Sequence, residues 1–132
     1  MRDGWRIALA IAAASNLVNG GWMLADPVGW YHAIPGVSGS GPLNEHFVRD
    51  VGATFTVLGL ALARGAAVPA ERPLAIGVVA AFYVAHALVH VWDVARGLFP
   101  PGQWRLDVLP IHLPAVVMVA ALVAVSRARS PR

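Results

Sequence analysis

The sequence contains no cysteine and no lysine, and it carries few charges of either sign. Without cysteine, disulfides, thiolate metal sites and cysteine nucleophiles are all excluded. Charged residues make up only 13% of the 132-residue chain, against roughly 25% in an average globular protein. The basic residues are all arginine and are scattered along the chain, which does not indicate a nucleic-acid-binding patch. Because apolar residues reach 58%, a soluble domain of this size could not cover its surface, and we predict an integral membrane protein.

Long uncharged runs predict four membrane-spanning helices within one domain, residues 1–132. We place the spans at about 6–25, 44–63, 73–94 and 106–126. A secretory signal peptide is the alternative for the first run. The fold class that follows is all-α: an antiparallel four-helix membrane bundle with a Gly/Pro-rich external loop over residues 26–43, which we expect to fold back over the bundle.

The second span is unusually short between its flanking charges. The thirteen residues 51–63 would rise about 20 Å as a helix, short of the roughly 30 Å hydrocarbon core. The helix must therefore begin earlier, at Asn44, which is a good N-cap residue. This start draws His46, Arg49 and Asp50 into the membrane or its interface.

The distribution of arginines predicts the orientation. With both termini on the same side, that side would carry Arg2, Arg6, Arg64, Arg72, Arg127, Arg129 and Arg132, and the other side Arg49, Arg96 and Arg105. The positive-inside rule then makes both termini cytoplasmic, in a cell inner (cytoplasmic) membrane. The expected partners are the lipid bilayer and a homo-oligomer or larger membrane complex, and not nucleic acid.

Ionisable residues that fall inside the predicted spans are the candidates for function. His86, His90 and Asp93 are spaced i, i+4 and i+7, so that they share one helix face. His46 and Asp50 have the same i, i+4 spacing in the second span. All five histidines fall in the predicted outer half or outer loops. Together with His112, these residues predict one polar site at the extracytoplasmic end.

A transition-metal site is the first hypothesis for these residues, because imidazole and carboxylate suit zinc, copper or iron. The predicted ligands are His86, His90, Asp93, His46, Asp50 and His112, and the predicted neighbours in the pocket are Arg49, Glu45, Asn16 and Asn19. A redox or hydrolytic enzyme would also need an open coordination position, so the sequence leaves catalysis undecided.

Three alternatives remain open for the same residues. In a non-enzymatic membrane subunit or interaction protein they would be interhelical hydrogen-bonding groups. They could instead border a pocket for a lipid or other apolar ligand, lined by Trp22, Trp92 and Phe82, or two of the histidines could hold haem. Asp107 and Arg105 are expected to anchor the start of the fourth helix.

Two segments carry the densest polar motifs, residues 44–52 (NEHFVRDVG) and residues 86–93 (HALVHVWD). The chain length and the four short spans, with both ends inside, resemble the small bacterial four-helix membrane proteins of the DoxX-like kind. The resemblance covers the whole chain at the level of architecture and implies a bacterial four-helix fold, and no site residue is carried over from it.

Overall fold

Long helices dominate the computed structural model, which describes residues 4–128. The long helices are α1 (Gly4–Ala25), α3 (Glu45–Ala67), α4 (Arg72–Ala95) and α6 (Leu113–Arg127), and the short ones are α2 (Pro27–Ala33) and α5 (Gln103–Asp107). Short 3₁₀ turns cover Val37–Gly39 and Pro69–Glu71. No strand occurs among residues 4–128, so the all-α prediction is confirmed. Arg2, Arg129 and Arg132, on which the orientation prediction partly rests, lie outside the described residues.

Local sequence signals explain where two of these helices start. Asn44 caps α3, because its side-chain oxygen accepts a hydrogen bond from the backbone N–H of Phe47 at 3.1 Å. Asp26 caps α2 in the same way through the N–H of Gly29 at 2.9 Å. The predicted early start of this helix, near Asn44, is therefore confirmed.

The fourth predicted span is continuous but irregular. A π-helical turn over Val108–His112 joins α5 to α6. Proline lacks an N–H and its ring clashes with the preceding turn, so Pro110 within this turn prevents a regular α-helical ladder.

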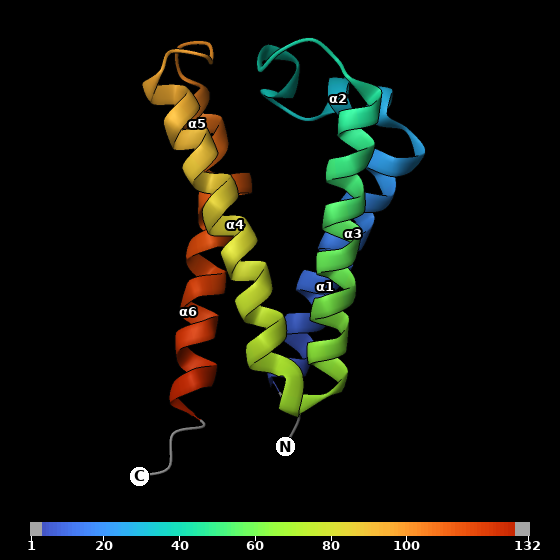
Figure 1. The fold of residues 1–132 in the computed structure, drawn as a ribbon, viewed down its shortest axis with the longest axis vertical. Coiled ribbons are helices and arrows are strands. Elements are labelled where there is room, and N and C mark those ends of the chain that lie inside the picture. The colour runs from blue at the N-terminus through green and yellow to red at the C-terminus, as the bar shows by residue number, and fades with distance from the viewer. Residues whose placement is uncertain (1–3, 129–132) are drawn as a thin grey trace.

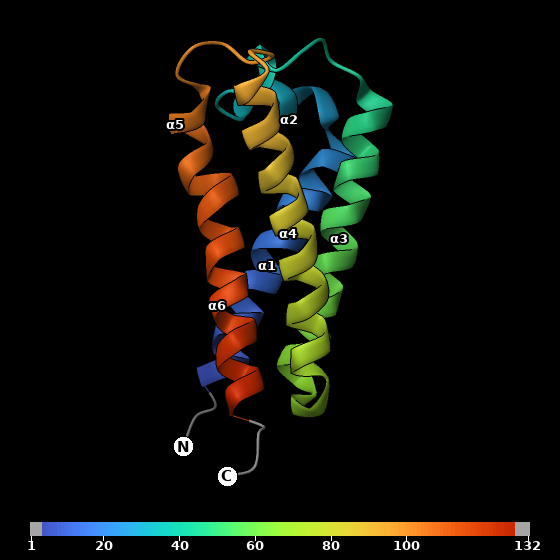
Figure 2. The same ribbon diagram turned by 60° about the vertical axis from the view of Figure 1, so that its left-hand side comes forward.

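The long helices run alternately up and down the molecule and form two hairpins (Figures 1 and 2). One hairpin pairs α1 with α3, and the other pairs α4 with α5 and α6. The hairpins meet near the end where α1 begins and α6 finishes, which we call the terminal end. They diverge towards the opposite end, which we call the loop end, where α2 and the loop before α5 lie (Figure 1).

Glycines allow α1 and α3 to approach each other closely. A Cβ added to Gly20 would lie 2.6 Å from the carbonyl oxygen of Gly52, and one added to Gly59 would lie 2.7 Å from the Leu17 side chain. Real side chains do not tolerate such distances, so the glycines are needed for this contact. The glycine seam holds α1 and α3 together as a tight pair.

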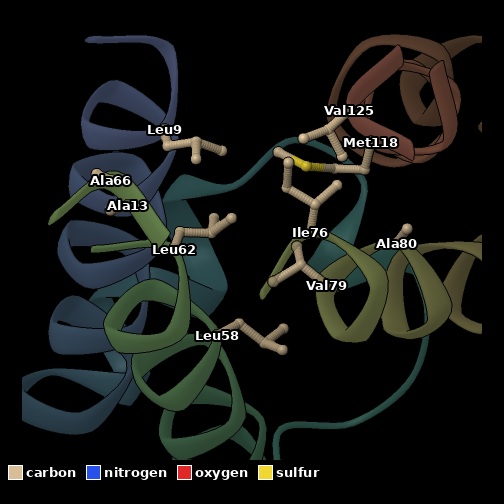
Figure 3. Packing of buried hydrophobic residues seen from close by; sticks show 10 residues of the cluster. All are labelled: Leu9, Ala13, Leu58, Leu62, Ala66, Ile76, Val79, Ala80, Met118 and Val125. Carbon is tan, nitrogen blue, oxygen red and sulfur yellow. The ribbon is translucent and has the colours of Figure 1, made fainter. Parts of the chain in front are cut away.

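The apolar core joins the two hairpins (Figure 3). Its buried members come from all four long helices and are Leu9, Ala13, Leu58, Leu62, Ala66, Ile76, Val79, Ala80, Met118 and Val125. The members from α4 lie near its start, and Val125 lies near the end of α6, so this core extends to the terminal end. The polar side chains that follow lie mainly towards the other end.

Residues 4–128 include four helical segments long and apolar enough to cross a membrane, consistent with a multi-pass membrane protein. They are Gly4–Ala25, Glu45–Ala67, Pro69–Ala95 and Gln103–Arg127, each slightly longer than the span predicted from the sequence. The orientation in the membrane stays a prediction.

Candidate functional site

A buried carboxylate next to a histidine is the centre of the site. Asp107 Oδ2 lies 3.0 Å from His90 Nδ1, and the Gln103 side-chain amide donates a hydrogen bond to Asp107 Oδ1 at 2.9 Å. The side chains of His90 and Asp107 are only 19% and 4% exposed. A carboxylate this deeply buried is stable only when hydrogen bonds satisfy its oxygens, and both oxygens have a partner here.

The short helix α5 brings this carboxylate to α4. Gln103 and Asp107 are its first and last residues and are spaced i, i+4, which places them on one face. Because α5 packs against α4, that face meets His90 from the side. The contact joins residues that are separated by a loop and lie on different helices.

Aromatic rings surround the two α4 histidines. The His86 ring stacks on Phe82, with ring centroids 5.7 Å apart and planes within 8°. His90 meets His86 edge-on at 4.8 Å and also contacts Phe99 at 5.6 Å.

The ring contacts continue into the other hairpin. Phe55 of α3 contacts Phe82 at 5.7 Å and Tyr83 at 6.4 Å. The Tyr83 hydroxyl donates a hydrogen bond to Asn16 Oδ1 of α1 at 2.9 Å. We call the connected set of rings the aromatic column; its members are Phe55, Phe82, Tyr83, His86, His90 and Phe99. It runs along α4 from a buried asparagine at one end to the buried Asp107 at the other.

The loop after α2 reaches this site from the loop end. Gly36, whose φ is +86°, packs directly against the Gln103 side chain, and a Cβ on Gly39 would lie 3.3 Å from Pro100. Residues of the Gly/Pro-rich loop thus contact the segment that carries the buried carboxylate, as expected for a loop that folds back over the bundle.

The predicted site residues on α3 pair with each other. His46 Nε2 lies 3.4 Å from Asp50, and their side chains are 86% and 63% exposed. Arg49 donates to Glu45 at 3.0 Å, and both of these side chains are about half exposed. Both are i, i+4 pairs within one helix, so the structure does not bring these residues to the α4 histidines.

Neither Asp93 nor His112 forms a hydrogen bond or ion pair with His90 or Asp107 among residues 4–128. The Asp93 side chain has no hydrogen bond or ion pair among residues 4–128, although its backbone oxygen accepts from Leu98. His112 lies in a shallow apolar groove of about 510 Å³ between α4 and α6, beside Ala87 and Leu88.

The two asparagines of the predicted pocket have structural partners. Asn16, which is 4% exposed, holds Tyr83 and also donates to the Ala12 carbonyl oxygen at 2.9 Å. Asn19 accepts a hydrogen bond from the Trp30 indole at 2.9 Å, which ties α2 to α1. Asn16 thus belongs to the end of the aromatic column, whereas Asn19 positions α2.

Sequence reasoning missed the parts that Asp107, Gln103 and Tyr83 play. Asp107 was expected only to anchor a helix start. The available signal was the i, i+4 spacing of Gln103 and Asp107 immediately before an apolar run, which puts an amide and a carboxylate on one face near the membrane boundary.

The metal hypothesis gains no support from the geometry. Among residues 4–128, no group of three or more histidine, aspartate or glutamate side chains is arranged to hold a metal ion. In the same part of the chain, every buried side-chain nitrogen and oxygen has a hydrogen-bond partner. The metal site predicted for His86, His90, Asp93, His46, Asp50 and His112 stays a prediction.

Comparison with protein-family models, with curated proteins and with solved structures finds no match to this chain. No family is therefore assigned to the chain, and the function has to be argued from the residues of the site.

Proposed function

We propose that this chain is a cytoplasmic-membrane protein that binds an apolar molecule carrying a hydroxyl or carbonyl group, in the loop-end half between the two hairpins. His90 forms the hydrogen bond to that group and can exchange a proton with it. Both termini are cytoplasmic in this proposal, which places the site in the outer half of the membrane. The arginine distribution supports this orientation.

The pairing of His90 with Asp107 carries the proposal. A carboxylate bound to Nδ1 holds the imidazole in one orientation and one tautomer, with Nδ1 protonated and Nε2 able to accept a proton. Among residues 4–128, no hydrogen bond uses His90 Nε2. The pair therefore presents a positioned acid–base group in a largely buried setting. Burying an ionisable residue there costs free energy, so such residues usually pair with another group or serve a function.

The surroundings of His90 favour an apolar ligand. Phe82 contacts His86, Phe99 contacts His90, and Phe55 contacts Phe82, so apolar rings adjoin the histidines. Ligand sites of this kind combine apolar and aromatic walls with a small number of polar groups that orient the ligand. A molecule dissolved in the bilayer could reach such a site without crossing water.

The variant His90→Asn separates binding from a purely structural role. Its amide can replace Nδ1 as the donor to Asp107, so the link between α4 and α5 is kept, while nothing replaces Nε2. His46→Asn is the matched control, because His46 also pairs with an aspartate but is exposed. The probes are 1-dodecanol and dodecane, which differ by one hydroxyl.

Thermal unfolding of the purified protein in detergent measures the effect. We expect 1-dodecanol to stabilise the wild type and His46→Asn more than dodecane does, through mass action on the folded state. The hydroxyl of 1-dodecanol adds one hydrogen bond to binding, which contributes about 0.5–1.5 kcal/mol. The affinity for 1-dodecanol should therefore exceed that for dodecane about two- to twelvefold. His90→Asn should fold normally and lose the difference between the two probes. Equal effects of both probes on the wild type, or a wild-type response from His90→Asn, would contradict the proposal.

The competing hypotheses give distinct results in the same preparations. About one zinc, copper or iron ion per chain, lost in a His86→Ala/His90→Ala variant, would favour the metal site. An absorption spectrum with a Soret band would favour haem. If His90→Asn matches the wild type in every measurement, the His90–Asp107 pair is interhelical hydrogen bonding alone.

A further inference from the structure

A second groove lies on the opposite half of the molecule, away from the histidines. It has a volume of about 330 Å³ and lies between α1 and α3 at the terminal end. Its lining includes Arg6, Ala10, Ala14 and Leu17 of α1, and Ala63 and Ala67 of α3. The alanines present only methyl groups, so the surface between the two helices is hollow there. In a membrane-spanning chain this hollow faces lipid. Its lining is mostly apolar, so apolar groups fill it more favourably than water does.

The groove matches one leaflet of the membrane in length. Arg6 and Leu17 are eleven residues apart on α1, which corresponds to about 16 Å along the helix axis. Half of a hydrocarbon core of roughly 30 Å is about 15 Å. An acyl chain that starts beside Arg6 and follows α1 would therefore remain within one leaflet along the whole groove.

Arg6 places a cation at the end of this groove. Among residues 4–128, the exposed Arg6 makes no ion pair. Arg64, near the end of α3, differs because Glu71 holds it through contacts of 2.9 and 2.8 Å. The Arg64 charge is thus balanced within the protein, whereas no carboxylate among residues 4–128 balances Arg6, whose charge can attract an anion from outside.

We infer that this groove binds one anionic phospholipid, with an acyl chain along the alanines and the phosphate on Arg6. Basic residues beside hollows between transmembrane helices are suited to anionic headgroups, because each arginine near the surface attracts them by about 1 kcal/mol. The α4–α6 groove is larger, at about 510 Å³, but has no arginine or lysine in its lining. It therefore offers space for an acyl chain without selecting a headgroup.

The test compares phosphatidylglycerol with phosphatidylcholine carrying the same palmitoyl and oleoyl chains. Native mass spectrometry of the full-length protein from detergent counts the lipids retained at increasing lipid concentration. We expect the wild type to bind phosphatidylglycerol about fivefold more tightly than phosphatidylcholine, which corresponds to one arginine at the interface. Arg6→Gln should remove this preference. Arg127→Gln is the matched control at the same end of the molecule, and it should keep the preference.

A second pair of variants tests the groove itself. Ala14→Leu fills the groove from an exposed position, and Ala8→Leu makes the same change at an exposed position outside the lining. We expect Ala14→Leu to weaken phosphatidylglycerol binding severalfold and Ala8→Leu to leave it unchanged. Circular dichroism checks the fold, and Ala10→Leu replaces Ala14→Leu if the latter does not fold.

Three results would overturn the inference. Equal retention of the two lipids by the wild type would show that no anionic site exists. Equal losses in Arg6→Gln and Arg127→Gln would show a general attraction between basic residues and anionic lipid. Wild-type binding by Ala14→Leu and Ala10→Leu would show that the lipid lies elsewhere. None of these measurements depends on His90, so they test the groove independently of the proposed function.

Discussion

Replacing Asp107 should reveal whether the buried carboxylate organises the loop-end half of the protein. In Asp107→Ala, His90 Nδ1 and the Gln103 amide each lose the acceptor that lies 3.0 and 2.9 Å away. The bond to His90 joins two helices, and such bonds average about 0.6 kcal/mol, whereas the Gln103 bond lies within α5 and contributes about 0.5–1.5 kcal/mol. Leaving a buried donor without a partner costs about 1–3 kcal/mol for each group. Because Gln103 is buried and His90 retains 19% exposure, we expect a loss of about 2 kcal/mol.

The variant Asp107→Asn should cost much less than Asp107→Ala. Its carbonyl oxygen can accept from Gln103, and its amide can donate to His90 Nδ1 if the imidazole changes tautomer. We therefore expect a loss below about 1 kcal/mol, together with a shift of the His90 proton from Nδ1 to Nε2. The shift would be visible in the ¹⁵N resonances of labelled histidine.

The assay is reversible unfolding in mixed micelles of a mild detergent and sodium dodecyl sulfate, with helicity as the signal. Asp50→Ala is the matched control, because Asp50 also faces a histidine at 3.4 Å but in an exposed pair, and exposed pairs contribute about 0–1 kcal/mol. The reasoning fails if Asp107→Ala stays within about 0.5 kcal/mol of the wild type. It also fails if Asp107→Asn is as destabilised as Asp107→Ala, since the loss would then follow from the charge and not from the hydrogen bonds.

Two further predictions concern the helix seam and the orientation. Gly20→Ala should destabilise the protein by roughly 2 kcal/mol, because its Cβ would lie 2.6 Å from the Gly52 carbonyl oxygen. The control Gly21→Ala, whose Cβ would have no neighbour within 4 Å, should be neutral or slightly stabilising. Equal effects of the two changes in the same unfolding assay would contradict the close contact. Since the chain has no cysteine, an introduced single cysteine can report the orientation. Ser38→Cys should react with a membrane-impermeant maleimide added to intact spheroplasts, and Ala70→Cys should react only after the spheroplasts are lysed. The opposite pattern would reverse the predicted topology.

The sequence allowed much of the architecture to be predicted because the relevant signals are local. Uncharged runs of membrane length mark the spans, and the shortness of the second run led to the helix start at Asn44, which the capping contact with Phe47 confirms. These predictions depend only on residues that are neighbours along the chain. They did not require knowledge of which helices touch.

The candidate site was less predictable because several arrangements could satisfy the same polar residues. The prediction brought His46 and Asp50 to the α4 histidines, since they too fall near the membrane boundary. In the structure these α3 residues already satisfy each other at i, i+4, so no contact with another helix is needed to balance them. His90, in contrast, takes its partner from α5, seventeen residues further along the chain.

The sequence by itself determined that the chain is helical, that four of its segments are apolar enough to cross a membrane, and where α3 begins. Only the tertiary structure decided that Asp107 and Gln103 meet His90, and that Arg6 stands beside a groove between α1 and α3. The physical reason is that helix formation and membrane length depend on residues close in sequence. The partner of a buried polar group depends on how the helices are rotated and where they diverge. Packing sets this geometry, through the π turn at Val108–His112 and the close glycine contacts between α1 and α3.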